Sequence, residues 1–201
     1  MSEFFGFLQL GFQHIVAWDA ADHILFLLAL AAIYRGRDWR AALLVISAFT
    51  IGHSVTLILA VTDVLVLPTR LVEFLIPVTI VATGVENLIM RERAARGTGA
   101  THRPIFAGIF GLVHGAGFAG YLKSLFVEQI AMPLVGFNVG IELGQIVVLG
   151  AAAAVLLSID ALLRTVPRRA GWPEAFQLRV MTLSAAITVV ATGWAVERFP
   201  R

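Results

Sequence analysis

Histidines and carboxylates fall inside long apolar segments of this 201-residue chain. An ionisable side chain costs about 2.5–3.5 kcal/mol at the centre of a membrane helix, so its presence there usually marks function. Imidazole and carboxylate groups together suit divalent transition metals such as Ni²⁺, Co²⁺, Zn²⁺ and Fe²⁺. The sequence has no cysteine, which excludes a thiolate site. The candidate metal ligands are Asp22, His23, His53, His114, Glu142, Glu86, His14 and Asp19.

Depth along the predicted helices sorts these candidates into groups. At a rise of about 1.5 Å per residue, five of them lie within roughly one helical turn of the midpoint of their segment. These five, on four different segments, are Asp22, His23, His53, His114 and Glu142. We expect them to form one central site, with His14 and Asp19 as an outer step and Glu86 as an inner step.

Structural alternatives apply to each of these residues. A histidine inside a membrane can simply hydrogen-bond a neighbouring helix. Glu142 follows Asn138 by four residues and precedes Gln145 by three, so these polar groups share one helix face and could equally serve as interhelical hydrogen bonds. Glu86 could instead pair with an arginine of the adjoining basic loop.

The elements that must position these residues are membrane helices. Hydrophobic residues make up 59% of the chain and charged residues only 14%, against roughly 25% charged in soluble domains. Six apolar segments of nearly membrane-spanning length occur at 10–33, 41–61, 71–90, 104–124, 134–158 and 178–196. We therefore predict an all-α integral membrane protein: a bundle of about six transmembrane helices forming a single domain over residues 1–201.

Basic residues alternate between the loops. The formal net charge is +2, but the arginines are confined to short clusters, which favours membrane topology over a nucleic-acid partner. The first, third and fifth loops carry the clusters, which include Arg35, Arg37, Arg40, Arg91, Arg93, Arg96, Arg103, Arg164, Arg168 and Arg169. The positive-inside rule then predicts that these loops are cytoplasmic and both termini extracytoplasmic. In the fourth segment, Gly111 and Gly115 form a GxxxG pair that predicts close helix packing.

Several ordered motifs resemble the HupE/UreJ family along nearly the whole chain. They are Gly11-Phe-Gln-His14, Asp22-His-Ile-Leu-Phe-Leu-Leu28, Phe49-Thr-Ile-Gly-His-Ser54, Val85-Glu-Asn87, Phe110-Gly-Leu-Val-His-Gly-Ala-Gly-Phe-Ala119 and Phe137-Asn-Val-Gly-Ile-Glu-Leu-Gly-Gln145. The resemblance implies a bacterial inner-membrane protein that supplies nickel for hydrogenase or urease maturation, acting as a secondary nickel or cobalt permease.

The same resemblance implies roles for particular residues. The family's first-helix signature falls on His14, Asp22 and His23, and the next candidates are His114 and Glu86. The signature separates its first histidine from the Asp-His pair by five residues, whereas seven separate His14 from Asp22 here. Two extra residues would turn His14 to another face of a regular helix.

The leading hypothesis is a permease for a divalent transition-metal ion, with Ni²⁺ as the first candidate and Zn²⁺ or Co²⁺ as others. Transporter sites usually lie near the bilayer midplane, as these residues do. The sequence has no G-x-x-x-x-G-K-[ST] loop for ATP, so transport would be passive or driven by a gradient. The alternative is a zinc-dependent intramembrane hydrolase that uses the same cluster. A third hypothesis is a membrane metal sensor or chaperone.

Overall fold

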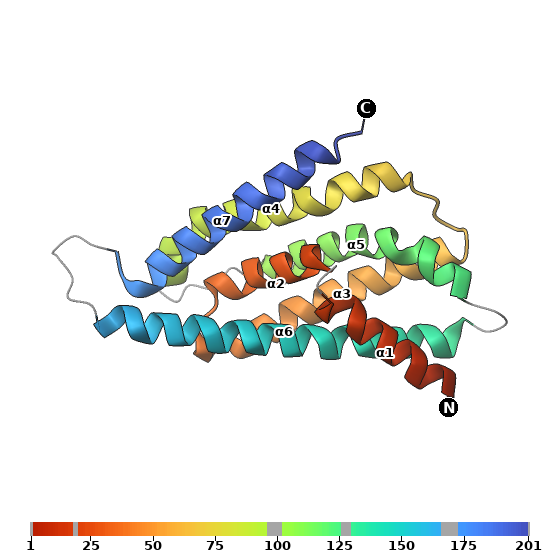
Figure 1. Cartoon of the computed structure of the whole chain (residues 1–201), viewed down its shortest axis with the longest axis horizontal. Helices are drawn as coiled ribbons and strands as arrows, with labels where there is room; N and C mark the ends of the chain where they lie inside the picture. Colours follow the sequence, from red (N-terminus) through yellow and green to blue (C-terminus); the bar gives the residue numbers. More distant parts are fainter. Residues whose placement is uncertain (1, 18–19, 96–101, 126–129, 166–172, 201) are drawn as a thin grey trace.

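Helices account for all the regular structure in the described part of the chain, which contains no strand. The computed structural model describes residues 2–17, 20–95, 102–125, 130–165 and 173–200. Figure 1 shows the helices lying lengthwise beside one another. The elements are α1 (Ser2–Val16), α2 (Ala21–Ile33), the 3₁₀ turn η1 (Gly36–Asp38), α3 (Trp39–Val61), α4 (Thr69–Ala95), α5 (Arg103–Leu125), α6 (Ala131–Thr165) and α7 (Ala175–Glu197).

The predicted membrane bundle is confirmed. Among the described residues, five helices are long and apolar enough to cross a membrane, and α1 with α2 gives a sixth span if the bent pair is counted as one. Helix α6 has 35 residues and is therefore about 52 Å long, well beyond the roughly 30 Å of hydrocarbon in a bilayer. One end of α6 must therefore project past the apolar core of the membrane.

The first span is broken, which differs from the single helix predicted over 10–33. Helices α1 and α2 meet at an angle of 67°. A new helix starts here because Asp22 lies in the first turn of α2, where a negative charge is stabilised by the helix dipole. Its Oδ1 atom also accepts the His23 N–H at 2.8 Å, one of the N–H groups that a helix start leaves without a partner.

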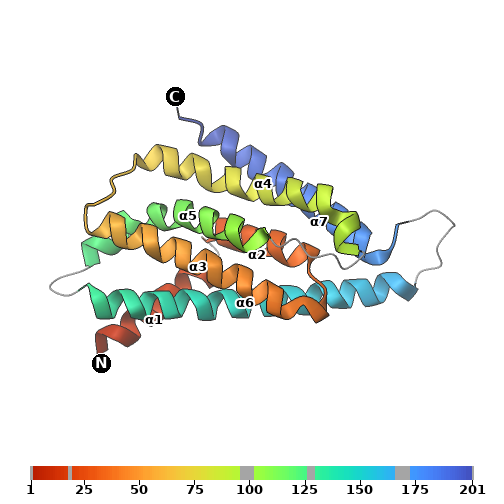
Figure 2. The same ribbon diagram turned by 180° about the vertical axis from the view of Figure 1, so that it is seen from behind.

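Glycines bring two pairs of helices, α3 with α5 and α1 with α6, into backbone contact. Figure 2 shows α3 and α5 side by side and α1 crossing behind α6. In α5, Gly111 and Gly115 lie directly against the Phe49 and His53 carbonyl oxygens of α3. A Cβ atom on either glycine would overlap those oxygens, so only a bare backbone allows this approach.

The second pair repeats this arrangement. Gly11 of α1 lies against the Phe137 carbonyl oxygen of α6, and Gly140 of α6 lies against the Leu8 carbonyl oxygen of α1. The polar residues of α1, α3, α5 and α6 are thus carried on two tightly joined pairs.

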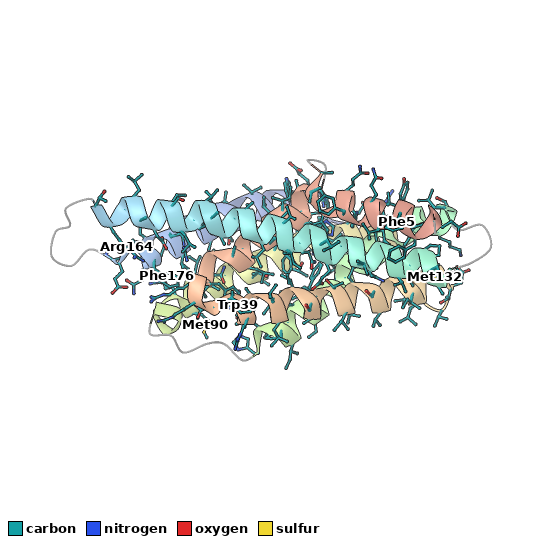
Figure 3. The ribbon with its side chains drawn as sticks, turned by 90° about the horizontal axis from the view of Figure 1, so that it is seen from below. Phe5, Trp39, Met90, Met132, Arg164 and Phe176 are labelled. Atoms are coloured by element: carbon teal, nitrogen blue, oxygen red, sulfur yellow. The ribbon has the colours of Figure 1, made fainter. Side chains whose placement is uncertain are left out.

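The two ends of the bundle differ in charge. Figure 3 shows Arg164, Phe176, Trp39 and Met90 toward one end and Phe5 and Met132 toward the other. The first end holds the start of α3, α5 and α7 and the end of α2, α4 and α6, and most of the basic residues that the structure describes lie there. We call it the basic end.

Candidate metal-ion site

Four histidines from four helices gather inside the bundle. Helix α1 supplies His14, α2 supplies His23, α3 supplies His53 and α5 supplies His114. The His23 ring centroid lies 4.6 Å from that of His14, 5.2 Å from that of His114 and 6.4 Å from that of His53. The His14 and His53 centroids are 6.0 Å apart. The bend between α1 and α2 makes this possible, because it turns the last turn of α1 toward the first turn of α2.

Asp22 fixes the orientation of the His23 ring. Its Oδ1 atom lies 3.0 Å from His23 Nδ1. Because an ionised carboxylate only accepts hydrogen bonds, Nδ1 carries the hydrogen and Nε2 keeps its lone pair. That Nε2 atom is buried and has no hydrogen-bond partner. An imidazole held this way by a carboxylate is the usual arrangement of a metal-ligating histidine.

Thr79 of α4 fixes His114 in a similar way. The Thr79 hydroxyl donates to the Ile76 carbonyl oxygen at 2.7 Å, so its oxygen is free to accept from His114 Nε2 at 3.2 Å. The hydrogen then sits on Nε2, and Nδ1 keeps its lone pair. This Nδ1 atom is also buried without a partner. His114 therefore offers its opposite nitrogen to the cluster.

His53 and His14 complete the set of unpartnered nitrogens. His53 is fully buried, and neither of its ring nitrogens has a hydrogen-bond partner. The Nε2 atom of His14 is likewise buried without one. A buried polar atom without a partner costs about 1–3 kcal/mol, so such atoms are rare in native proteins and call for an explanation. Four neighbouring histidines that all share this property point to a ligand that the cluster receives.

Phenylalanines enclose the cluster, and a cavity leads to it. Phe49 lies 5.1 Å from His114, and Phe118 lies 4.0 Å from His14, both measured between ring centroids. A cavity of about 730 Å³ is lined by His14, His23 and His114. Its lining also includes Asp22, Leu10, Gln13, Phe118 and Tyr121. His53 does not line this cavity and lies deeper in the protein.

The four histidines offer ring nitrogens as possible metal ligands, but they do not form a complete coordination shell. Among the described residues, no three His, Asp or Glu side chains meet at the spacing of a bound metal ion. The ring centroids already lie 4.6–6.4 Å apart, so the directions of the ring nitrogens, more than the distances between the rings, would have to change for the rings to share one ion. Rotation of the side chains would bring about this change.

Glu142 is not part of the histidine cluster and belongs to a different polar region. Its carboxylate accepts the Ser47 and Thr50 hydroxyls of α3, each at 2.6 Å. The Thr50 hydroxyl oxygen also lies 2.9 Å from Gln145 Oε1. The Ser54 hydroxyl donates to Asn138 Oδ1 at 2.7 Å. We call these six residues the α3–α6 polar network.

The other two predicted ligands are not part of the histidine cluster as described. Glu86 lies near the basic end, where its carboxylate is 2.7 Å from His102 Nε2 and 3.7 Å from Arg103 Nη1. This arrangement corresponds to the alternative in which Glu86 pairs with the basic loop. Asp19 lies outside the described residues.

Two features of the structure escaped the sequence analysis. The Thr79 contact with His114 gives no signal in the sequence, because threonine is common in membrane helices and usually bonds its own backbone. The second feature is a buried ion pair in which Arg179 Nη1 lies 2.7 Å from Asp160 Oδ2. The signal for this pair was present, since Asp160 ends one apolar segment and Arg179 begins the next.

Comparison with known protein families identifies the family of this chain. A family model described as HupE / UreJ protein matches residues 1–198. No curated protein and no solved structure matches the chain. The family match confirms the resemblance drawn from the motifs.

Proposed function

The chain belongs to the HupE/UreJ family of nickel and cobalt transporters, and we propose that it is a secondary permease for a divalent transition-metal ion, with Ni²⁺ as the first candidate cargo. Co²⁺ and Zn²⁺ are further candidates. The observation that carries the proposal is the group of four histidines, three of them buried and His14 half-buried, whose buried and unpartnered nitrogens lie together. Neutral imidazole nitrogen is a preferred ligand for all three ions.

The residues take distinct roles in this proposal. His23, His53, His114 and His14 bind the ion through their ring nitrogens. Asp22 orients His23 and supplies a negative charge that offsets the ion's charge. The end of α1 contributes as well, because the negative end of a helix dipole favours a cation within its last turn, where His14 lies.

Access to the cluster is from one side. The cavity that reaches it is lined by Tyr121, one turn before the end of α5 that lies away from the basic end. Toward the basic end, the buried rings of Phe26 and Phe49 pack at 4.9 Å between centroids and close the interior. Release on the other side therefore requires a second conformation. The broken α1–α2 span is the candidate moving element, since discontinuous helices form the ion sites of many transporters.

The charge asymmetry indicates which side of the membrane the cavity faces. If the basic end faces the cytoplasm, as the positive-inside rule predicts, the cavity opens to the outside, which suits import of the cargo. The protein would then lie in the bacterial inner membrane with both termini extracytoplasmic. The imported ion would supply metalloenzyme maturation.

Metal uptake by proteoliposomes tests the proposal. We expect saturable ⁶³Ni²⁺ uptake that protein-free liposomes lack and that a His23→Ala variant loses. Absence of saturable uptake of Ni²⁺, Co²⁺ and Zn²⁺ by the folded wild-type protein would overturn it. A stoichiometric, tightly retained Zn²⁺ without uptake would instead favour the intramembrane hydrolase.

A further inference from the structure

Two cavities at the basic end share part of their lining and form one continuous groove. The first, of about 430 Å³, is lined by Arg35, Arg37 and Arg164. The second, of about 230 Å³, extends between α3 and α6 and is lined mainly by apolar side chains. Arg35, Gly36 and Leu157 belong to both linings. The groove thus has a cationic mouth and an apolar extension.

The mouth carries an excess of positive charge. Asp160 also lines it, but its charge is neutralised by Arg179 at 2.7 Å. Glu174 is the other acidic residue of the lining, and Arg37 lies 3.8 Å from the Asp38 carboxylate. With the Asp160–Arg179 pair set aside, Arg35, Arg37 and Arg164 face these two carboxylates, which leaves one excess positive charge. Arg164 forms no ion pair within the described part of the chain. Guanidinium groups bind phosphate oxygens through paired hydrogen bonds, so the mouth suits a phosphate.

The apolar extension runs along α6 in the direction of the membrane core. Ile146, Leu149, Ala153 and Leu157 form this side of it, and Ile146 and Leu157 are each 43% exposed. From Ile146 to Leu157 the helix rises about 16 Å, roughly half of the ~30 Å hydrocarbon core. The position of a Cβ atom on Gly150 has no atom within 4 Å, so the groove is open there.

We propose that this groove binds one anionic phospholipid, with its phosphate among Arg35, Arg37 and Arg164 and one acyl chain along α6. A free phosphate fits only the mouth, and a zwitterionic lipid lacks the net negative charge that the mouth favours. Arg35 is held in place for this role, since its guanidinium carbon lies 4.3 Å from the centre of the Phe176 ring. The proposal stands apart from metal transport, because the groove shares no residue with the histidine cluster.

Native mass spectrometry of the detergent-purified protein tests it with three probes: dioleoyl phosphatidylglycerol, dioleoyl phosphatidylcholine and inorganic phosphate. We expect one phosphatidylglycerol molecule to be retained preferentially over phosphatidylcholine. One arginine near a bilayer surface contributes about a fivefold factor in affinity for anionic lipid, so an Arg37→Gln, Arg164→Gln double variant should bind phosphatidylglycerol about 25-fold more weakly. Equal retention of both lipids, or an unchanged affinity in the double variant, overturns the proposal.

Two matched glycine substitutions test the apolar part of the groove. Gly150→Leu should displace the acyl chain and lower phosphatidylglycerol retention. Gly193→Leu on α7 is the control, because its Cβ position is equally open but lies outside the groove. Equal lipid loss in both variants, or binding of inorganic phosphate without any lipid preference, counts against a lipid site. Metal binding should persist in all these variants, which separates this result from failure of the proposed transport.

Discussion

Two adjoining faces of α3 carry polar groups at similar positions along the helix, but the hydrogen bonding of the two groups differs. On one face, His53 joins three other histidines, and every ring in that cluster has a buried nitrogen without a partner. On the other face, the Ser47, Thr50 and Ser54 hydroxyls bond Glu142 and Asn138 of α6 at 2.6–2.7 Å. Both faces lie inside the same predicted membrane span.

This difference separates binding from structural support. In the α3–α6 polar network, both Glu142 carboxylate oxygens and the serine and threonine hydroxyls have hydrogen-bond partners, and these bonds join two helices, each worth about 0.6–2 kcal/mol. A cluster of unsaturated nitrogens lowers stability until a ligand arrives. We therefore propose that the histidine face binds the ion and that the α3–α6 polar network holds the two helices together. Substitutions on the histidine face should therefore lower metal affinity, whereas substitutions in the α3–α6 polar network should lower stability.

The largest effect is expected from His53→Ala, which removes a central ligand. Nickel affinity should fall more than about 100-fold, beyond the 10–100-fold typical of losing an outer partner of a metal ligand. Isothermal titration calorimetry on the purified protein measures this, with size-exclusion chromatography to verify folding. The control is His102→Ala, which removes the histidine that contacts Glu86 near the basic end. Equal loss in both variants would remove the distinction between the cluster and other histidines.

Asp22→Asn tests the orienting carboxylate and should have the next largest effect. The amide can still accept the His23 Nδ1 hydrogen, but it lacks the charge that makes the imidazole a better ligand. Nickel affinity should fall about 10–100-fold. Asp63→Asn is the control, since this exposed carboxylate pairs with Lys123 away from the cluster. A loss as complete as that of His53→Ala would instead indicate direct ligation by Asp22.

Glu142→Leu should reverse the pattern by lowering stability while leaving metal affinity unchanged. The substitution removes the acceptor of the Ser47 and Thr50 hydroxyls, and we expect a loss of about 1–2 kcal/mol. Thermal unfolding in detergent and calorimetric nickel titration give the two readouts. Ser158→Ala is the control, because its exposed hydroxyl bonds only the Ala154 carbonyl oxygen of its own helix. A loss of nickel affinity as large as that of His53→Ala would indicate that Glu142 is a metal ligand after all.

The sequence predicted how far along its helix each candidate ligand lies, but not toward which neighbouring helix its side chain points. Counting residues from the helix centres placed His23, His53 and His114 at one level, and the structure brings His23 within 6.4 Å of each of the other two, measured between ring centroids. The same count placed Glu142 at that level, but it could not show that Glu142 bonds the Ser47 and Thr50 hydroxyls on the side of α3 next to His53. Only packing, through the glycine contacts of α5 on α3, determines which face of α3 turns inward.

The prediction for His14 assumed that residues 10–33 form one continuous helix. Seven residues separate it from Asp22, and on a continuous helix that spacing turns His14 aside. The break between α1 and α2 removes the constraint and brings the His14 ring to 4.6 Å from His23. An apolar stretch of membrane-spanning length gives no sign of such a break, because hydrophobicity alone fits a straight helix equally well.

Thr79→Val tests the contact between Thr79 and His114, which the sequence did not predict. It should have the smallest effect on nickel affinity. Valine keeps the shape of threonine but cannot accept the His114 Nε2 hydrogen, so His114 can adopt either tautomer. Losing one hydrogen bond of about 0.5–1.5 kcal/mol should weaken nickel affinity about 2–10-fold. Thr83→Val is the matched control, since this buried hydroxyl one turn along α4 donates only to the Thr79 carbonyl oxygen. If the two variants bind nickel equally, the hydroxyl of Thr79 does not set the His114 tautomer, and the ring is oriented by Phe49 and Phe26 packing instead.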